Sequence, residues 1–194
     1  MRTRSGDKRG DILRASIGIF SRQGFDTAKV ASIAHEAGIA TGSVYLYFQG
    51  KDEILDCLFE EFWDNLLATM GTIEHTDPLL RIEAQLGQFF DALAANRAFS
   101  MIYLRDFHRF IARTSPRQDS WRACIEKGRI AFQEASSRPM DTADLALPHA
   151  YLFGGVRSAL EHWMSHEDIP LELVRHRMLT MAMAGIEAVA KEMP

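Results

Sequence analysis

Apolar side chains recur at intervals of three and four residues along most of the chain, which is the period of an amphipathic α-helix. Leu13, Ile17 and Phe20 form one such stripe, and a second runs from Val30 to Ala37. No strand-like alternation of apolar and polar residues is sustained, and no Asn-Gly or Asp-Gly pair marks a hairpin. The pattern therefore predicts an all-α fold.

Glycines set the predicted ends of the first helices. Gly24 and Gly38 follow the first two apolar stripes, and glycine readily adopts the left-handed conformation that is common after a helix C-terminus. A short third helix is expected over about 41–48, before the Gln49-Gly50 break. A longer amphipathic helix then begins at Asp52 and continues to Met70.

Prolines divide the rest of the chain. Apolar periodicity restarts around Pro78, Pro116, Pro148 and Pro170, as expected where proline occupies the first turn of a helix or its lead-in. Five further helices are predicted, over about 78–95, 98–112, 117–137, 142–165 and 170–191. With about nine helices in total, we expect an N-terminal domain of three short helices over 1–51 and a larger helical domain over 52–194. The helix that begins at Asp52 would connect the two, so movement of the larger domain can reach the smaller one.

The segment from Phe25 to Leu55 has the plan of a helix-turn-helix: a packing helix, a glycine turn at Gly38 and a short second helix. Val44 and Phe48, with Ile39 before them, are spaced to pack the third helix onto the first two. The positions between these apolar residues are then left facing outward.

An exposed Tyr45-Leu46-Tyr47 run suits a surface that meets DNA. Phenol hydroxyls can donate to phosphates, while the rings and Leu46 can touch base edges or thymine methyl groups. The alternative for each tyrosine is a ring that is half-buried at the helix surface. Lys51 is placed to meet a phosphate as a point charge, and Thr27 is expected to cap the second helix and also to bond a phosphate.

These residues resemble the DNA-binding region of the tetracycline-repressor (TetR) family over about residues 10–56. The resemblance lies in Gly24-Phe25 before the second helix, the Ala37-Gly38 turn, and a Tyr-x-Tyr-Phe run that is soon followed by Lys51. Together with the reasoning above it predicts the following DNA-binding residues: Thr27, Lys29, Thr41, Gly42, Ser43, Tyr45, Leu46, Tyr47 and Lys51. Gly42 would let the backbone approach DNA closely, and Tyr47 and Lys51 would contact mainly the phosphate backbone.

The chain departs from the family pattern at Ala40, where the family commonly has a serine that caps the recognition helix. Thr41 can take over this capping role and so shift the start of the helix. A hydroxyl that bonds its own backbone is less free to contact a base. Whether Thr41 caps the helix or reads a base is therefore open.

The net charge of −4 argues on its own against nucleic acid as a partner, but the charge is distributed unevenly. Residues 1–51 contain eight Lys and Arg residues against four Asp and Glu residues, so this part carries +4 and the remainder −8. A basic part is typical of DNA binding because Lys and Arg displace counterions from phosphates. Arg2 and Arg4 are either an arm that enters the minor groove or a solvated tail.

A single short reading helix recognises few base pairs, so we expect a homodimer that binds a palindromic operator. The last two helices are the predicted interface, because small residues repeat every four positions in one and apolar residues form a stripe in the other. The predicted interface residues are Ala150, Gly154, Ser158, His162, Val174, Met178, Met181 and Gly185. The alternative is that these stripes belong to the core of one subunit.

Aromatic residues are frequent in the larger domain and can line an apolar pocket, although at helical spacing they also suit a plain core. The predicted pocket residues are Phe62, Leu66, Phe89, Phe90, Tyr103, Phe107, His108, Trp121, Phe153 and Arg157. By the resemblance, the chain is a repressor that leaves its operator when a small apolar or amphipathic effector binds, such as an acyl-CoA or a drug-like compound. The run from Tyr45 to Leu55 also resembles family members that respond to long-chain acyl-CoA.

Two other classes of function were weighed. His162 and His166 are four residues apart on a helix and could share a metal ion, but no HExxH, GxSxG or glycine-rich phosphate loop accompanies them. We therefore expect no metal, no cofactor and no enzymatic activity. The second class is a helical interaction protein whose basic N-terminal part binds an acidic partner.

The remaining expectations concern the cell compartment. Cys57 and Cys124 lack a CxxC or Cys/His partner, so we expect reduced and buried thiols. The N-terminus has no apolar signal region, and no stretch approaches the length of a membrane span. These features predict a cytoplasmic protein that does not bind membranes.

Overall fold

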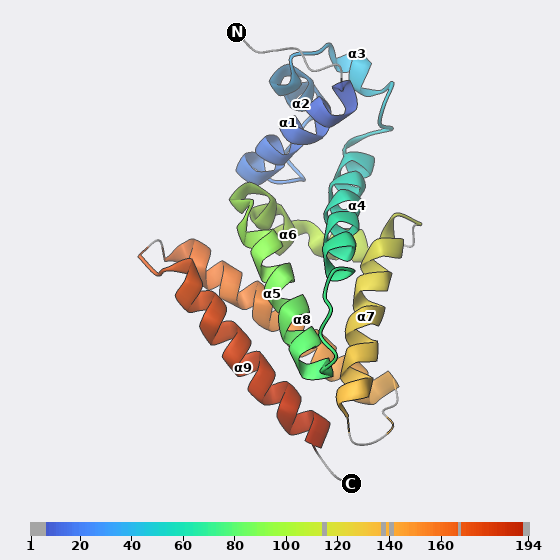
Figure 1. Ribbon diagram of the computed structural model, residues 1–194. Coiled ribbons are helices and arrows are strands. Elements are labelled where there is room, and N and C mark those ends of the chain that lie inside the picture. The colour runs from blue at the N-terminus through green and yellow to red at the C-terminus, as the bar shows by residue number, and fades with distance from the viewer. Residues whose placement is uncertain (1–6, 114–115, 137–138, 140–141, 167, 192–194) are drawn as a thin grey trace. The chain divides into compact units, whose positions relative to one another are not determined.

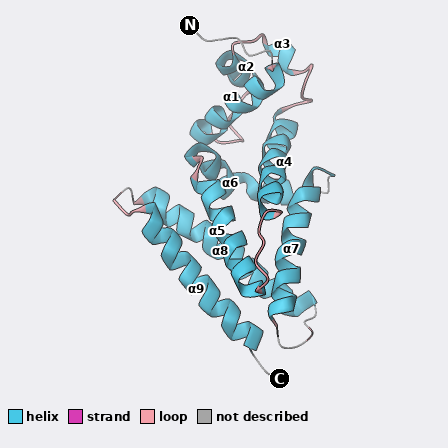
Figure 2. Cartoon of the chain, viewed as in Figure 1, coloured by secondary structure: helices cyan, strands magenta, loops and turns pink. Residues whose placement is uncertain are grey.

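The computed structural model describes residues 7–113, 116–136, 139, 142–166 and 168–191 (Figure 1). All regular secondary structure in these residues is helical, which confirms the predicted all-α class (Figure 2). The elements within them are α1 (Lys8–Gln23), α2 (Val30–Ala37), α3 (Thr41–Val44), α4 (Lys51–Met70), α5 (Pro78–Ala94), α6 (Arg97–Ile111), the 3-10 turn η1 (Pro116–Gln118), α7 (Asp119–Ala135), α8 (Thr142–Ser165) and α9 (Leu171–Lys191). Arg2 and Arg4 lie outside the described residues.

The contacts between residues divide the chain into two compact units. The first contains the described residues of Met1–Phe62 and Ala98–Gln118, and the second those of Trp63–Arg97 and Asp119–Pro194. The division passes through α4 and places nearly all of α6 with the N-terminal helices. The predicted boundary after residue 51 is therefore not the boundary of these units. The division into a DNA-binding part before this residue and a ligand-binding part after it stays a prediction.

Phe59 of α4 is the centre of the first unit's core. Its ring is fully buried and lies 5.2 to 6.3 Å, centroid to centroid, from the four rings that α6 presents to it. These are Phe99, Tyr103, Phe107 and Phe110. Tilted and edge-on arrangements of this kind are favourable for aromatic pairs, so this cluster joins α4 to α6.

Ion pairs add to this attachment. Arginines from α1, from the residues after α6 and from η1 pair with carboxylates along α4; the pairs are Arg9–Glu61, Arg113–Asp52, Arg113–Asp56, Arg117–Glu53 and Arg117–Glu60, with N···O distances of 2.6 to 2.9 Å. Burial raises the pKa of Asp56, although Arg113 acts in the opposite direction. The Arg113 pair therefore offsets only part of the cost of removing this carboxylate from water.

In the second unit, α5 packs against α7, α8 and α9, and α8 packs against α9 (Figure 1). Trp63 stacks on Phe89, and Phe153 of α8 lies 5.1 Å from Phe89. Arg175 of α9 forms a two-pronged ion pair with Asp91 of α5, at 2.7 and 2.9 Å. Gly87 makes room for this arginine, because a Cβ atom there would lie 2.6 Å from the guanidinium.

Most helix boundaries agree with the predicted ones to within a few residues. Gly24 and Gly38 follow α1 and α2 with positive φ of 83° and 71°, as expected of glycines that end helices. Only Gly38 has the left-handed conformation, because ψ of Gly24 is 152°. Pro78 lies in the first turn of α5, but Pro148 lies inside α8, so the expectation that it marks a helix start is wrong. The helix itself begins six residues earlier, at Thr142, as the predicted range of 142–165 has it.

Both cysteines are buried thiols, as expected. Burial raises the pKa of Cys57, and it raises that of Cys124 to about 11.

Among the described residues, no helix combines the length and the apolar character that a membrane span requires.

Candidate nucleic-acid interface

The turn between α2 and α3 is built by Gly38. Its φ of 71° and ψ of 33° place it in the left-handed region, where its N–H donates to the last turn of α2. The N–H of Ile39 reaches the carbonyl of Ala34 at 3.0 Å, which closes the end of the helix. The chain thereby leaves α2 in a fixed direction and begins α3 three residues after Gly38.

The regular part of α3 is shorter than predicted, because it ends at Val44 and not near Phe48. The N–H groups of Tyr47 and Phe48 nevertheless both donate to the Val44 carbonyl at 3.0 Å, so a turn continues the helix as far as Phe48. Val44 and Phe48 are buried, as predicted, and Ile39 is half-buried. These side chains anchor the segment from the inside.

The opposite side of this segment is an exposed apolar and hydroxyl surface. Leu46 is 81% exposed, Tyr45 56% and Tyr47 40%. Thr41 and Gly42 are exposed as well, and a Cβ atom built at Gly42 meets nothing within 4 Å. The alternative of a half-buried ring stays open for Tyr47, of which more than half is covered, and Tyr45 is the more exposed of the two tyrosines. A surface of this kind is available to a base edge or a phosphate.

Ala40 is the N-cap residue of α3, and it forms no side-chain bond to the helix. Thr41 is therefore the first helical residue and does not occupy the cap position. This favours the alternative in which its hydroxyl is available to a partner.

The predicted capping role of Thr27 is wrong. The N-cap residue of α2 is Lys29, in extended conformation, and the Thr27 hydroxyl donates to the carbonyl of Gln23 at the end of α1. The Thr27 hydroxyl is thus bound to the end of α1, and the N-cap position of α2 falls on Lys29, which forms no side-chain cap bond. Lys29 itself is exposed.

Lys51 is half-buried, and its side chain lies against the loop between α1 and α2. It is the first residue of α4, and its Nζ donates to the carbonyls of Phe25 and Asp26 at 2.9 Å and lies 3.4 Å from that of Ala28. Its predicted contact with a phosphate stays untested. The Glu53 carboxylate, one turn further along α4, accepts from the N–H of Gln49 at 2.7 Å and so closes the start of this helix.

Two arginines of α6 also reach the N-terminal helices, and the sequence reasoning missed them. Arg105 donates to the Phe20 carbonyl at the end of α1, and Arg109 pairs with Asp26 at 2.6 Å. Arg105, Arg109, Arg113 and Arg117 follow one another every four residues. That spacing predicts one basic helix face, but only Arg105 and Arg109 lie in α6, which ends at Ile111. The spacing also does not reveal which carboxylates and carbonyls these side chains contact.

A family model described as bacterial regulatory proteins of the tetR family matches residues 12–58, which include the whole helix-turn-helix described above. Residues 12–58 thus match the DNA-binding region of the TetR family, over about a quarter of the chain. This confirms the resemblance found in the sequence.

Individual transcriptional regulators are similar to parts or all of the chain. The transcriptional repressor KstR2 of Mycobacterium tuberculosis is 32% identical over 104 residues, a match that spans about half the length of each protein, 53% of this chain and 52% of KstR2. The fatty acid metabolism regulator of Bacillus subtilis is 21% identical over 185 residues, which cover 90% of this chain and 93% of that protein. A crystal structure of FadR from Bacillus subtilis with stearoyl-CoA has the same fold, with a TM-score of 0.71, 19% identity and coverage of 91% and 98%.

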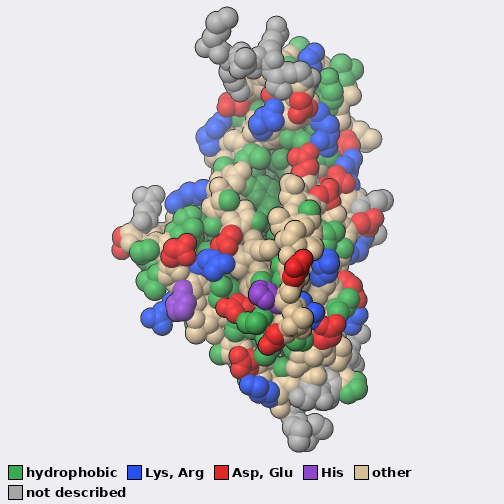
Figure 3. Space-filling model, in the orientation of Figure 1, with side chains coloured by type: hydrophobic (Ala, Val, Ile, Leu, Met, Phe, Trp, Pro, Cys, Tyr) green, Lys and Arg blue, Asp and Glu red, His purple; other side chains and the backbone are tan. Residues whose placement is uncertain are grey.

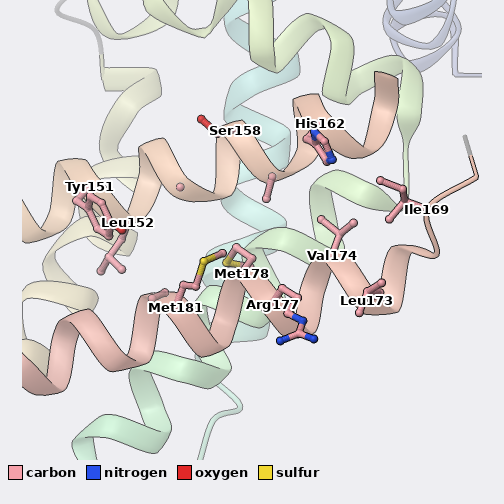
Figure 4. A pocket seen from close by; sticks show the side chains of 13 residues that line it. Tyr151, Leu152, Ser158, His162, Ile169, Leu173, Val174, Arg177, Met178 and Met181 are labelled. Carbon is pink, nitrogen blue, oxygen red and sulfur yellow. The ribbon is translucent and has the colours of Figure 1, made fainter. Parts of the chain in front are cut away.

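In the second unit, α8 and α9 enclose an open, mainly apolar hollow of about 480 Å³ (Figure 4). Five of the eight predicted interface residues line it, namely Ser158, His162, Val174, Met178 and Met181. Tyr151 and Met181 are apolar side chains of this hollow that are 67% and 64% exposed. Ala150, Gly154 and Gly185 do not line it. The alternative of a core stripe within one subunit holds for Met178, which is buried, but not for Met181.

The ten predicted pocket residues divide between the two units. Phe62 stacks on Phe99 in the first unit, where Tyr103 and Phe107 also lie, and Leu66, Phe89, Phe90, Trp121 and Phe153 belong to the second. His108 and Arg157 are exposed. A single pocket lined by these residues stays a prediction.

The histidine pair on α8 is a stacked pair of rings. The centroids of His162 and His166 are 4.2 Å apart, and Nδ1 of His166 lies 2.8 Å from the His162 carbonyl. Within the part of the chain that the structure describes, no group of three or more His, Cys, Asp or Glu side chains is placed to hold a metal ion.

On the face shown in Figure 3, positively and negatively charged side chains are intermixed and not separated by sign.

We call residues 38–48 the reading segment. Substitution by alanine should change the free energy of unfolding in opposite directions at the two glycines near its start, Gly38 and Gly42. Gly38→Ala places a Cβ atom at φ of 71° and should lower the free energy of unfolding by about 1–2 kcal/mol. Gly42→Ala adds a methyl group in open space within a helix and should raise it by about 0.4–1 kcal/mol. Urea unfolding followed by circular dichroism measures both. Equal effects of the two changes would contradict the described turn.

Proposed function

We propose that the chain is a ligand-responsive transcriptional repressor that binds a palindromic operator as a homodimer. The observation that carries the proposal is the Tyr45-Leu46-Tyr47 surface, which is exposed while Val44 and Phe48 beside it are buried in the helix-turn-helix. The match of residues 12–58 to the tetR family model and the repressor name of KstR2 support it. The proposal assigns binding of DNA and of an effector to the chain, and no chemical reaction. A protein that binds operator DNA must reach it, so the proposal also places the chain in the cytoplasm.

On DNA, the α3 segment would enter the major groove. Thr41, Ser43, Tyr45 and Leu46 are proposed to choose the sequence, and Gly42 to allow close approach of the backbone. Tyr47 would donate to a phosphate, as would Lys29, which stands at the N-terminus of α2 where the helix dipole also favours an anion.

The dimer is proposed to form through α8 and α9. An apolar hollow with exposed Tyr151 and Met181 is a surface that a second copy can cover. The two reading segments of a dimer then meet half-sites about 34 Å apart, or a multiple of that distance.

The effector is proposed to be a small apolar or amphipathic compound of the acyl-CoA class. The support is the aromatic interior of both units and the stearoyl-CoA that the FadR structure from Bacillus subtilis contains. Effector binding would favour a dimer whose reading segments have the wrong separation for the operator.

Leu46→Ala should change sequence preference. We expect binding to a labelled duplex from the region upstream of the chain's own gene to weaken about tenfold, while binding to random DNA stays the same, because a lost base contact costs about 1–3 kcal/mol. Fluorescence anisotropy at fixed salt measures both. If the wild-type protein prefers its upstream region no more than random DNA, the repressor proposal fails and a basic interaction protein takes its place.

Met181→Arg should prevent dimerisation. The change puts a charge into the apolar hollow, whose desolvation in a dimer interface is costly. Sedimentation velocity should show a monomer with unchanged helical content. Ile130→Arg on α7 is the matched control, because Ile130 is also an exposed apolar residue but does not line the hollow. Loss of the dimer in both variants would contradict the proposed interface.

Stearoyl-CoA should release the protein from DNA. We expect micromolar stearoyl-CoA to weaken binding to the upstream duplex at least tenfold, and coenzyme A without the acyl chain to leave it unchanged. Calorimetric titration of the free and the DNA-bound protein gives the two affinities for the ligand. Equal affinities would exclude this effector, since linkage requires the ligand to prefer the free form.

A further inference from the structure

The ammonium group of the half-buried Lys51 lies against three backbone carbonyls of the first unit. An ammonium has three N–H donors, and three backbone carbonyls lie within reach, those of Phe25, Asp26 and Ala28 at 2.9, 2.9 and 3.4 Å. The Phe25 ring adds a cation–π contact, with Nζ 4.7 Å from its centroid. Four contacts therefore converge on a single side chain.

These carbonyls belong to the loop between α1 and α2, which carries Thr27 and Lys29 toward the proposed DNA surface. The loop is also held from α6, because Arg109 pairs with the Asp26 carboxylate at 2.6 Å and lies 5.1 Å from the Phe25 ring centroid. Phe25 is buried between these attachments and contacts Phe20 of α1. Lys51 thus connects the start of α4 to a loop that has a second, independent attachment.

The position of Lys51 explains why its charge is directed inward. A cation at the first residue of a helix faces the positive end of the helix dipole, which is unfavourable. The three carbonyl oxygens present their negative ends and offset this cost. Turning the ammonium toward a phosphate would leave these carbonyls without the donor that they have in this structure.

We propose that Lys51 is a positioning residue for operator binding, which holds the α1–α2 loop against the start of α4 and does not itself contact a phosphate. The inference rests on the proposed operator binding. By this inference, a Lys51 variant loses affinity for the operator because the α1–α2 loop is displaced. The cation that meets a phosphate from this region is then Lys29.

The dependence of affinity on salt separates the two roles. A phosphate contact contributes about 0.9 to the slope of log K against log salt concentration. Lys51→Ala should weaken binding to the upstream duplex about tenfold and leave the slope unchanged between 50 and 300 mM KCl. Lys29→Ala, the matched control, should reduce the slope by about one. A reduction by about one in Lys51→Ala would overturn the proposal.

Lys51→Arg provides a second test, because it keeps a charge that binds phosphates well but replaces a compact ammonium by a planar guanidinium. We expect Lys51→Arg to bind the upstream duplex as weakly as Lys51→Ala. Affinity close to that of the wild type would contradict a positioning role that depends on the carbonyl cage.

Hydrogen exchange of the DNA-free protein tests the loop directly. Amides of residues 25–29 should exchange at least tenfold faster in Lys51→Arg and Lys51→Ala, while those of α9 keep their rates. Unchanged loop rates would refute the positioning role. This measurement needs no DNA, so it also decides the inference if the wild-type protein shows no operator preference. If Lys51→Ala fails to fold, Lys51→Arg carries both tests.

Discussion

The reading segment depends on the burial of Val44 and Phe48. A regular helix of four residues cannot be stable by itself, since nucleation of a helix is costly and isolated helices need about 12 residues or more. Two buried side chains and the left-handed turn at Gly38 supply the order that the helix lacks. Because these anchors point inward, Leu46 is left 81% exposed without loss of packing. The apolar surface for DNA is thus a consequence of the way in which the segment is held.

The same logic extends to the loop before α2. It has no regular structure of its own, and its place is set by long side chains that arrive from other helices. Lys51 arrives from α4 and Arg109 from α6, and both contact Phe25. Since the Phe59 cluster joins α4 to α6, a displacement of either helix changes the support of this loop. The first unit thereby contains a mechanical connection from α6 to the proposed DNA surface.

Features that depend on near neighbours in the sequence were predictable. Helix boundaries followed from apolar spacing, and the roles of Gly24 and Gly38 followed from backbone sterics. The roles of Thr27 and Lys51 depend on partners whose positions are set by the fold: the Lys51 ammonium meets a carbonyl 26 residues away. A long, flexible side chain can bond to any of several acceptors that the fold brings near it. The spacing of residues along the chain does not show which acceptors these are. The same reason explains why the arginines of α6 were not assigned to the N-terminal helices.

Salt acts differently on the two kinds of contact that hold the first unit together. Ion pairs such as Arg109–Asp26 and Arg113–Asp52 join full charges at partly exposed sites, so counterions screen them. The Lys51 ammonium faces carbonyl dipoles and an aromatic ring at close range, where screening by mobile ions has little effect. Raising the salt concentration therefore weakens the contact of the loop with Arg109 of α6 before its contact with Lys51 of α4. An operator complex that weakens with salt would then lose phosphate contacts while the loop still keeps its attachment to α4.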